Sequence, residues 1–340
     1  MSSVDTTRLD DVRAALDAFP RVRLGVWPTP VEPFAGLDGP GAGRIWVKRE
    51  DLASPRYGGN KVRKLEYLLA NGGGPLVAFG GMGSHHVLAT AVHAAALGRE
   101  CYGVLLEQPV TGHTAAVLAL NERECAGIVR RRRPLAALGA LGRLAVRAVS
   151  GGNGAPSPPR ILYPGGSSPL GTLGWVGGGL ELAAQIASSA FPEPAEIYVA
   201  YGSGGTAVGL ALGLALAAVR CEVVAVRVAT RLVGNARYGA RLARRTFELL
   251  SGRADLGPMP ALRLRFEHGF IGAGYGHPTA AAEAAICRAR ASGVPLEPTY
   301  TGKALAALLE AASRDRGGRT RLFLDTYSSI DNLRTARAAE

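Results

Sequence analysis

Cysteine is scarce in this chain, with only four among its 340 residues. Cys101, Cys125, Cys221 and Cys287 lie far apart and form neither a Cys-x-x-Cys pair nor a dense framework, so we expect no disulfide bonds and no structural zinc site. This usage is typical of a reducing cytoplasm. The first thirty residues also lack a continuous hydrophobic stretch, so the sequence does not indicate a secretory signal.

Acidic residues are the minority among the charges, with 27 Asp and Glu against 39 Lys and Arg and a net charge of +12. This excess favours anionic ligands, whether nucleic acid, acidic lipid or small phosphorylated and carboxylate compounds. The densest basic run, Arg130 to Arg133, has no interleaved aromatic residues, and we interpret it as solvated surface of a loop or helix end. We therefore predict no nucleic-acid partner.

One uncharged stretch, Ile197 to Val219, is long enough to raise the question of a membrane span. Its sequence, IYVAYGSGGTAVGLALGLALAAV, begins like a buried strand, continues with a glycine-rich loop, and ends like a helix whose small residues allow close packing. We favour this reading and predict no membrane partner.

Glycine is plentiful, with 46 residues, and short apolar strands alternate with helical patterns along a chain long enough for two domains. The predicted strands are RIWVK, PLVAFGG, ECYGVLL, EIYVA, EVVAVRVA and RLFLDT. This alternation predicts a mostly parallel α/β sheet with ligands at the carboxyl ends of its strands. Residues 151–160 are typical of a linker and 256–265 of a second loop, so we expect two lobes with a cleft between them.

The stretch GGNKVRKLE, residues 58–66, places a lysine at the start of a predicted helix. On a helical wheel Lys61 falls in the apolar sector and should face inward, Lys64 lies on its flank, and Arg63 and Glu66 should point away. A buried ammonium tends to lose its proton, and the neutral amine is a nucleophile, so Lys61 is a candidate Schiff-base lysine. The alternative is a lysine that extends from the first turn into solvent.

The stretch VAYGSGGTAVG follows a predicted strand and opens a helix, so its amide groups and the Thr206 hydroxyl can hold a phosphate. Gly202, Gly204 and Ala207 also match a loose dinucleotide-binding pattern. The next strand ends in VRVATR without the acid that a nicotinamide site needs, so a phosphate monoester fits better. An NADP-dependent oxidoreductase that uses Arg227 or Arg231 remains as the rival hypothesis.

A second glycine-rich turn, FGGMGSHHVLATA, leads into another predicted helix with Ser84 at or near its cap. Ser84, His85 and His86 can present a hydroxyl, amide groups and imidazoles to a carboxylate or an acidic ring oxygen. Adjacent histidines point in different directions on a helix and no further ligand stands at the usual spacing, so we predict no metal site.

Several motifs together resemble the 1-aminocyclopropane-1-carboxylate deaminase / D-cysteine desulfhydrase family of pyridoxal-phosphate enzymes. These motifs are VKREDL, GGNKVRKLEYLLA, GGMGSHH, YPGGSSPLGTLGW, GSGGTAVGLALG, GYGHPT and EPTYTGKALAAL. The resemblance implies a tryptophan synthase β-like α/β protein of fold type II, with two domains and three layers. It also implies a discontinuous large domain of residues 1–60 and 165–340, a small α/β domain of residues 61–164, and pyridoxal 5'-phosphate in the cleft.

The resemblance also assigns roles to residues at matching positions. Lys61 is expected to hold the cofactor covalently and to move protons, and Ser84 and Tyr300 to act on the substrate. The cofactor-binding set would comprise Asn60, Lys61, Lys64, His85, Gly202, Ser203, Gly204, Gly205, Thr206, Thr301 and Thr326. The substrate-binding set would comprise Ser84, His85, His86, Tyr275 and Tyr300.

The chain departs from the family pattern at two places. His85 stands where the family usually has asparagine in Ser-Asn-His, and LDTYSS retains only Thr326 of the desulfhydrase motif His-Thr-Gly-Gly. Thr301 stands where the deaminases carry glutamate, which places the chain closer to the desulfhydrases.

The resemblance therefore implies a homodimeric lyase or deaminase that releases a 2-oxo acid and ammonia by β-elimination. Alternatives of the same cofactor class are β-replacement, cyclopropane ring opening and racemisation in a specialised biosynthetic pathway. A non-catalytic small-molecule-binding homologue is the alternative from another class.

Overall fold

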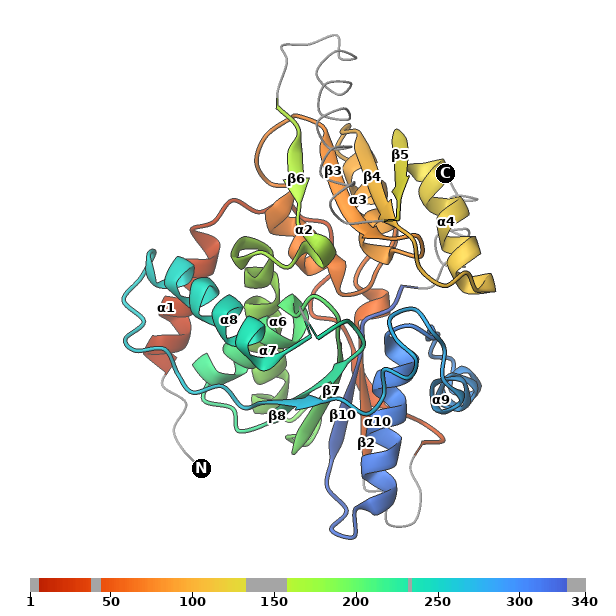
Figure 1. The fold of residues 1–340 in the computed structure, drawn as a ribbon. Helices are drawn as coiled ribbons and strands as arrows, with labels where there is room; N and C mark the ends of the chain where they lie inside the picture. Colours follow the sequence, from red (N-terminus) through yellow and green to blue (C-terminus); the bar gives the residue numbers. More distant parts are fainter. Residues whose placement is uncertain (1–5, 38–43, 133–157, 232–233, 329–340) are drawn as a thin grey trace.

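Two separate β-sheets organise the chain in a computed structural model that describes residues 6–37, 44–132, 158–231 and 234–328 (Figure 1). The larger sheet has six strands in the order β1-β2-β10-β7-β8-β9, and the smaller has four in the order β5-β4-β3-β6. Neighbouring strands are parallel in both sheets, except that β1 runs antiparallel to β2. The predicted mostly parallel α/β arrangement is confirmed.

The strands of the larger sheet are β1 (Val31–Pro33), β2 (Ile45–Arg49), β7 (Glu196–Tyr201), β8 (Glu222–Arg227), β9 (Leu264–Glu267) and β10 (Arg321–Asp325). Those of the smaller sheet are β3 (Leu76–Gly81), β4 (Cys101–Leu106), β5 (Gly127–Arg131) and β6 (Arg160–Leu162). The α-helices are α1 (Thr6–Asp17), α2 (Lys61–Leu68), α3 (His85–Ala95), α4 (Gly112–Glu124), α6 (Pro169–Ala187), α7 (Gly205–Leu216), α8 (Ala236–Ser251), α9 (Ala280–Ala291) and α10 (Thr301–Arg314). Short 3-10 turns, η1 (Glu50–Leu52) and η2 (Pro164–Gly166), precede α2 and α6.

Both faces of the larger sheet are buried. Successive side chains of a strand point to opposite faces, so each strand contributes to two cores. Ile197 and Val199 of β7 belong to a core with α6, α7 and α8, whereas Tyr198 belongs to a second core with α9 and α10. These helices lie on the two sides of the sheet in Figure 1. The result is the three-layer architecture expected from the sequence.

The smaller sheet packs chiefly against α3, which in turn packs against α2 and α4. Leu65 of α2, Val87 and Leu88 of α3, and Leu105 of β4 share one buried cluster. The helix α3 begins where it does because Ser84 caps it, with its hydroxyl accepting a hydrogen bond from the amide of Val87 at 3.3 Å. This cap fixes Ser84 directly after the carboxyl end of β3.

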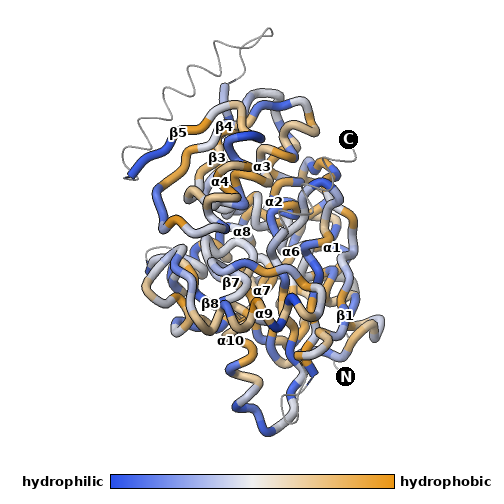
Figure 2. Tube along the Cα trace, turned by 90° about the vertical axis from the view of Figure 1, so that its right-hand side faces the viewer, coloured by the Kyte–Doolittle hydropathy of each residue, from blue (hydrophilic) through white to orange (hydrophobic). Residues whose placement is uncertain are grey.

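The stretch Ile197 to Val219 folds into β7, a glycine-rich turn and α7, as predicted. Within the described residues we find no helix that is both long enough and apolar enough to cross a membrane. Figure 2 shows hydrophobic residues along α7, whose buried side chains belong to the core on one face of the larger sheet.

Two expectations about irregular segments need correction. Of the predicted linker 151–160, residues 151–157 lie outside the described part of the chain, and Arg160 begins β6 by pairing with Leu76 of β3. The predicted loop 256–265 ends in β9, whose Leu264 pairs with Val223. Pairing with a neighbouring strand overrides the local turn composition at both ends, where the apolar residues Ile161, Leu162 and Leu264 belong to the new strands.

The basic run from Arg130 lies at the end of β5 rather than in a loop or at a helix end. Arg130 forms an ion pair with Glu122 of α4, and Arg132 pairs with Glu107 at 3.2 Å. The end of β5 is correspondingly hydrophilic in Figure 2. Arg133 and Pro134 lie outside the described residues.

Candidate active site

Lys61 is the first residue of α2, and its amine faces inward as the helical wheel predicts. Its Nζ donates a hydrogen bond to Oδ1 of Asn60 at 2.9 Å, and Nδ2 of Asn60 donates to the Thr206 hydroxyl at 2.8 Å. Burial lowers the pKa of Lys61 to about 8, against an opposing attraction from Glu297. Nearly a tenth of these amines would be uncharged at pH 7, which suits a nucleophile.

The backbone conformation two residues before Lys61 requires glycine. Gly59 has φ +83°, and a Cβ there would lie 2.9 Å from the carbonyl oxygen of Thr326. The close approach lets that same carbonyl accept a hydrogen bond from the Asn60 amide at 3.2 Å. Thr326, at the carboxyl end of β10, is thereby brought beside the start of α2.

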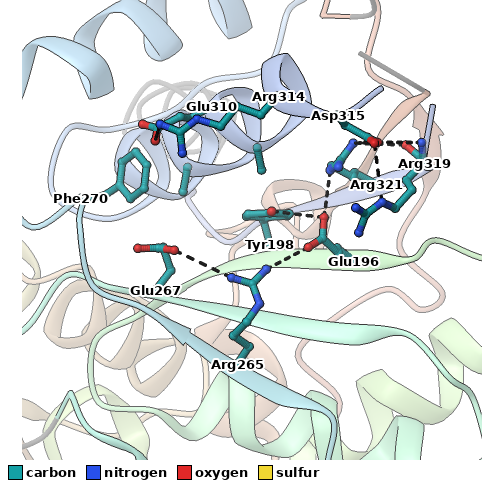
Figure 3. A pocket seen from close by; sticks show the side chains of 12 residues that line it. Glu196, Tyr198, Arg265, Glu267, Phe270, Glu310, Arg314, Asp315, Arg319 and Arg321 are labelled. Carbon is teal, nitrogen blue, oxygen red and sulfur yellow. Dashed lines mark hydrogen bonds and ion pairs between the residues drawn. The ribbon is translucent and has the colours of Figure 1, made fainter. Parts of the chain in front are cut away.

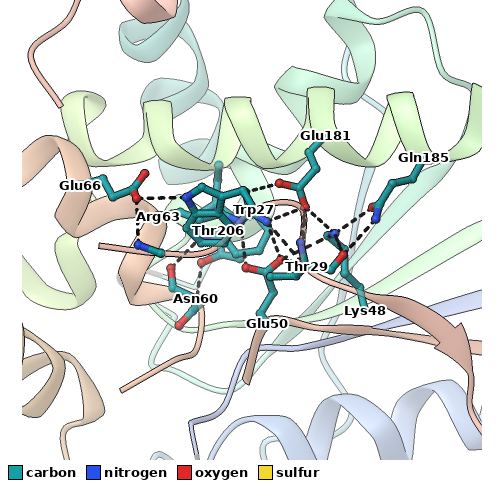
Figure 4. A network of polar contacts seen from close by, with 12 residues as sticks. Trp27, Thr29, Lys48, Glu50, Asn60, Arg63, Glu66, Glu181, Gln185 and Thr206 are labelled. Atoms are coloured by element: carbon teal, nitrogen blue, oxygen red, sulfur yellow. Dashed lines mark hydrogen bonds and ion pairs between the residues drawn. The ribbon is translucent and has the colours of Figure 1, made fainter. Parts of the chain in front are cut away.

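Arg63 and Glu66 do not point away from the protein, contrary to the prediction. Arg63 is 5% exposed and Glu66 is 3% exposed. Figure 4 shows that the N-terminal segment and α6 cover this side of α2. The guanidinium of Arg63 lies 3.8 Å from the ring centroid of Trp27, and Oε1 of Glu66 accepts a hydrogen bond from the Trp27 indole at 3.0 Å.

A buried ion network holds the same helix against α6. Arg63 Nε donates to Glu50 at 2.8 Å and its NH2 group donates to Glu181 at 2.8 Å. Lys48 Nζ donates to Glu181 at 2.7 Å and to Gln185 at 2.9 Å. Because these ion pairs are sequestered from water, removal of one partner would leave an uncompensated charge, so the network locks α2 in place.

A cluster of hydrogen-bonding groups, which we call the anion cradle, lies beside Lys61 and comprises Lys64, Ser167, Ser203, Gly205 and Thr206. Nζ of Lys64 donates to the Gly165 carbonyl at 3.0 Å and to the Ser167 hydroxyl at 3.1 Å. The Ser167 hydroxyl also accepts from the Gly205 amide at 3.1 Å and lies 2.7 Å from the Ser203 hydroxyl. The cradle joins α2, η2 and the start of α7.

The cradle fits an anion such as a phosphate. Lys64 is only 2% exposed and, among the described residues, its ammonium has no carboxylate partner. Gly204, the N-cap of α7, has φ +88° and offers no side chain to the first amides of the helix. Burial lowers the pKa of Lys64 well below its ordinary value, with repulsion from Lys61 adding to the effect. A bound dianion would stabilise the charged form of Lys64 and so raise its pKa again.

His86 adds a further indication of an absent ligand group. It is 4% exposed, and neither ring nitrogen makes a hydrogen bond within the described residues, although the Tyr163 backbone is near. A Cβ at Gly166 would lie 3.4 Å from both the His86 ring and the Lys64 stem, so these side chains flank one glycine. Buried polar groups are normally satisfied, so His86 is suited to a ligand at the cradle.

His85 points elsewhere and both of its nitrogens are engaged. Nδ1 lies 2.5 Å from the Tyr57 hydroxyl and Nε2 lies 3.0 Å from Nε2 of His113. The predicted hydrogen bond from His85 to a ring oxygen of the cofactor would require one of these contacts to be exchanged. Ser84, next to it, is 6% exposed, and its hydroxyl already serves as the helix cap.

Tyr275 and Tyr300, both predicted to contact the substrate, lie together with their hydroxyls 2.6 Å apart. A Cβ at Gly202 would lie 3.2 Å from the Tyr300 ring, so this tyrosine borders the glycine loop that follows β7. Glu297 fixes the turn by accepting hydrogen bonds from the amides of Tyr300 and Thr301 at 2.7 and 2.8 Å. The Thr301 hydroxyl also contacts Glu297, at 3.3 Å.

Sequence reasoning missed several residues of this site, namely Tyr57, His113, Ser167 and Glu297. A signal existed for two of them. The glycines and serines of YPGGSSP, between a strand and a helix, suit an anion-binding turn, and an acid placed four residues before α10 suits a cap. Nothing in the local pattern indicated that Tyr57 and His113 meet His85.

A large surface hollow elsewhere is not this site. A cavity of about 290 Å³ lies at the amino ends of β7 and β10 (Figure 3). The Gly202 loop, in contrast, follows the carboxyl end of β7. Its charges neutralise one another: Arg321 Nε and Arg265 NH2 each donate to Glu196 at 2.9 Å, and Arg314 pairs with Glu310 at 2.7 Å. The charged side chains of this cavity are paired with one another and do not point together toward a bound ligand.

A family model described as pyridoxal-phosphate dependent enzyme matches residues 22–324. The chain belongs to this family. The pyridoxal-phosphate enzyme is 34% identical over 318 residues to the D-cysteine desulfhydrase of Yersinia pestis (strain Pestoides F), covering 88% of this chain and 91% of the relative. It is 31% identical over 313 residues to that of Klebsiella pneumoniae (strain 342), with the same coverage.

Solved structures agree with this assignment. A homologue of ACC deaminase superposes on this pyridoxal-phosphate enzyme with a TM-score of 0.79 and 27% identity, covering 96% of this chain and 99% of the other. The processed form of threonine deaminase isoform 2 from Solanum lycopersicum matches with a TM-score of 0.61, 14% identity, and coverage of 98% and 88%, which shows the fold alone. The predicted family, fold type II architecture and pyridoxal-phosphate cofactor are confirmed.

Proposed function

We propose that this pyridoxal-phosphate enzyme catalyses β-elimination from a small amino acid, in the manner of a D-cysteine desulfhydrase, and releases a 2-oxo acid and ammonia. The observation that carries the proposal is the Lys61 amine, whose pKa is lowered to about 8 and which lies beside the anion cradle. The similarity to D-cysteine desulfhydrases over most of both chains supports the choice of reaction.

The cradle residues would hold the phosphate, because Lys64 supplies a buried cation and the start of α7 supplies backbone amides, of which that of Gly205 donates to the Ser167 hydroxyl. Gly202, Ser203, Gly204, Gly205 and Thr206 form the loop around it. When bound, the cofactor supplies the electron sink that stabilises negative charge at Cα. We assign Asn60, Thr301 and Thr326 to orient the ring. Asn60 accepts a hydrogen bond from Lys61, and its amide donates to the Thr326 carbonyl. Thr301 is hydrogen-bonded to Glu297, whose charge acts on Lys61.

The reactive side chains then have different tasks. Lys61 holds the cofactor and its amine accepts the Cα proton of the amino acid. Ser84 binds the substrate at the start of α3, where the helix N-terminus favours a carboxylate. Tyr300, hydrogen-bonded to Tyr275, is positioned to give a proton to the departing β-substituent.

Two histidines complete the proposed substrate site. His85 and His86 border the substrate, the first through its ring and the second through a free nitrogen.

Because β3, β4, β5 and β6 form a sheet of their own, we assign residues 61–164 to the small domain, and residues 1–60 and 165–340 to the large one. We also propose a homodimer and a cytoplasmic location, which the family resemblance and the cysteine usage support.

Three alternatives of the same cofactor class stay open: β-replacement, cyclopropane ring opening and racemisation. Thr301 in place of glutamate favours elimination over ring opening, because a hydroxyl does not hold the ring nitrogen protonated as a carboxylate does. The NADP-dependent oxidoreductase is set aside because the chain belongs to the pyridoxal-phosphate family.

The test is a spectral titration of the purified, cofactor-loaded protein with D-cysteine, L-cysteine and 1-aminocyclopropane-1-carboxylate, with 2-oxo acid release measured in parallel. We expect a change of the visible band and product with D-cysteine. A band that responds only to the cyclopropane would transfer the chain to the ring-opening branch. Lys61→Ala should abolish the borohydride-sensitive band, and Ser84→Ala should slow turnover while the cofactor remains bound. A coloured, reducible Lys61→Ala protein would contradict the assignment.

A further inference from the structure

Tyr57, His85 and His113 form a continuous hydrogen-bonded chain beside the candidate active site. The Tyr57 hydroxyl lies 2.5 Å from Nδ1 of His85, and Nε2 of His85 lies 3.0 Å from Nε2 of His113. The Tyr57 and His85 rings are nearly coplanar, with 11° between their planes and 6.3 Å between their centroids. We call these three residues the imidazole chain.

Neighbouring elements hold the imidazole chain from both sheets. Nε2 of His93, on α3, donates a hydrogen bond to the Tyr57 carbonyl at 2.9 Å. Tyr327, which follows β10 of the larger sheet, presents its ring at a steep angle to both imidazoles, with centroid distances of 5.0 Å to His85 and 5.9 Å to His113. The rings therefore have one orientation set by packing as well as by hydrogen bonds.

The contacts favour one arrangement of the hydrogens. Tyr57 is buried, and within the described residues Nδ1 of His85 is the hydrogen-bond acceptor that its hydroxyl contacts, so donation to Nδ1 leaves no buried donor unsatisfied. In this arrangement the proton of the His85 ring is on Nε2 and is donated to Nε2 of His113. His113 in turn carries its proton on Nδ1, and this half-buried residue lies in the first turn of α4.

The groups that face these imidazoles keep them uncharged. Burial, His113 and Lys61 together lower the pKa of His85 well below its ordinary value. Burial lowers the pKa of His113, against an opposing attraction from Glu297. A second proton on His85 would occupy Nδ1, break the hydrogen bond from Tyr57, and place a cation near Lys61.

We propose that His113 and Tyr57 are positioning residues for the active site, which fix the orientation and the Nε2–H tautomer of His85 and keep its ring neutral beside Lys61. The inference rests on the proposed function, in which His85 forms one wall of the substrate site. It implies that His85 takes no part as an acid or base, because both nitrogens are committed. Proton movement is then left to Lys61 and Tyr300.

The first test is histidine-selective ¹⁵N NMR of the full-length protein, with and without pyridoxal phosphate, which is tractable because the chain has six histidines. Assignment by single histidine variants identifies each ring. We expect His85 as the neutral Nε2–H form and His113 as the neutral Nδ1–H form from pH 6 to 8. An Nδ1–H form or a cation at His85 in this range would overturn the proposal.

The second test compares His113→Gln with His113→Leu. The glutamine Oε1 reaches about as far as Nε2 of His113 and can still accept from Nε2 of His85, whereas leucine leaves that buried donor without a partner. We expect kcat on the amino acid identified above to fall about tenfold in the leucine variant and less than threefold in the glutamine variant, with KM nearly constant. The leucine variant should also lose the single-tautomer His85 signal. Equal effects of the two substitutions on kcat and on the spectrum would refute the positioning role.

Two further outcomes are informative. Stoichiometric binding of Zn²⁺ that requires both His85 and His113 would overturn the proposal, because the converging nitrogens would then serve a metal. If no tested amino acid is turned over, the proposed function fails. The NMR spectra still decide the tautomer and the neutrality of His85, so the two failures are distinguishable.

Discussion

The Asn60→Asp substitution tests directly whether the environment of Lys61 makes its amine reactive. It replaces one atom of the side chain and places a carboxylate oxygen where Oδ1 of Asn60 now accepts a hydrogen bond from Nζ at 2.9 Å. The Thr206 hydroxyl, which now accepts from Nδ2, can rotate and donate to the carboxylate instead. The substitution therefore keeps the contacts of residue 60 with Lys61 and Thr206 and adds one negative charge.

The magnitude follows from the charge that is added. An opposite charge in direct contact typically raises the pKa of a lysine by about 1 to 3. In the native protein the pKa of Lys61 is lowered to about 8. Each increase by one in that pKa reduces the uncharged fraction at pH 7 about tenfold. We therefore expect the Lys61 amine to react about ten to a thousand times more slowly at pH 7, and the reaction to recover as the pH is raised.

The assay is trace acetylation of the cofactor-free protein with acetic anhydride between pH 6 and 11, with Lys61 followed by mass spectrometry. The native midpoint should lie near 8 and that of the variant clearly higher. Asn71→Asp is the matched control, because it adds the same charge at an exposed position. A native midpoint above 10, or an Asn60→Asp midpoint equal to the native one, would refute the reasoning that burial and Asn60 control this amine.

Three further substitutions probe the cradle, the tyrosine pair and the ion network. Lys64→Met should weaken pyridoxal-phosphate binding about tenfold or more, measured by equilibrium dialysis, and unchanged affinity would exclude Lys64 from the phosphate site. Tyr300→Phe breaks the 2.6 Å contact with Tyr275 and should lower kcat at least tenfold while the visible band is retained; normal turnover would show that the proton comes from another group. Glu50→Gln leaves Arg63 short of a buried carboxylate and should lower the free energy of unfolding in urea by about 3 kcal/mol, whereas a loss below 1 kcal/mol would mean that water or Glu181 compensates fully.

The sequence alone predicted those features that depend on local periodicity and on caps. The inward position of Lys61 follows from the spacing of apolar residues in α2, and the cap at Ser84 follows from the strand, glycine and serine order before α3. The glycine loop after β7 was identifiable because phosphate-binding turns have a local composition.

Partners that lie far apart in the chain could not be predicted in this way. Arg63 was expected at the surface because its own helix shows only a polar position there, yet Glu181 binds it from 118 residues away. Likewise, nothing near His85 in the sequence indicates that Tyr57 and His113, each 28 residues away, contact its ring. A polar residue becomes buried when distant segments supply its hydrogen bonds, and a helical wheel contains no information about those segments.

The anchoring of α2 also has a consequence for how the enzyme is made. The helix that carries Lys61 is held by Trp27 from the N-terminal segment, by Glu181 from α6, and by Ser167 through Lys64. Contacts of such long sequence separation form late in folding, because closing large loops is entropically costly. A chain that emerges from the ribosome must reach α6 before the lysine has its final surroundings. The Lys61 amine therefore acquires its final surroundings only after more than half of the protein has been synthesised.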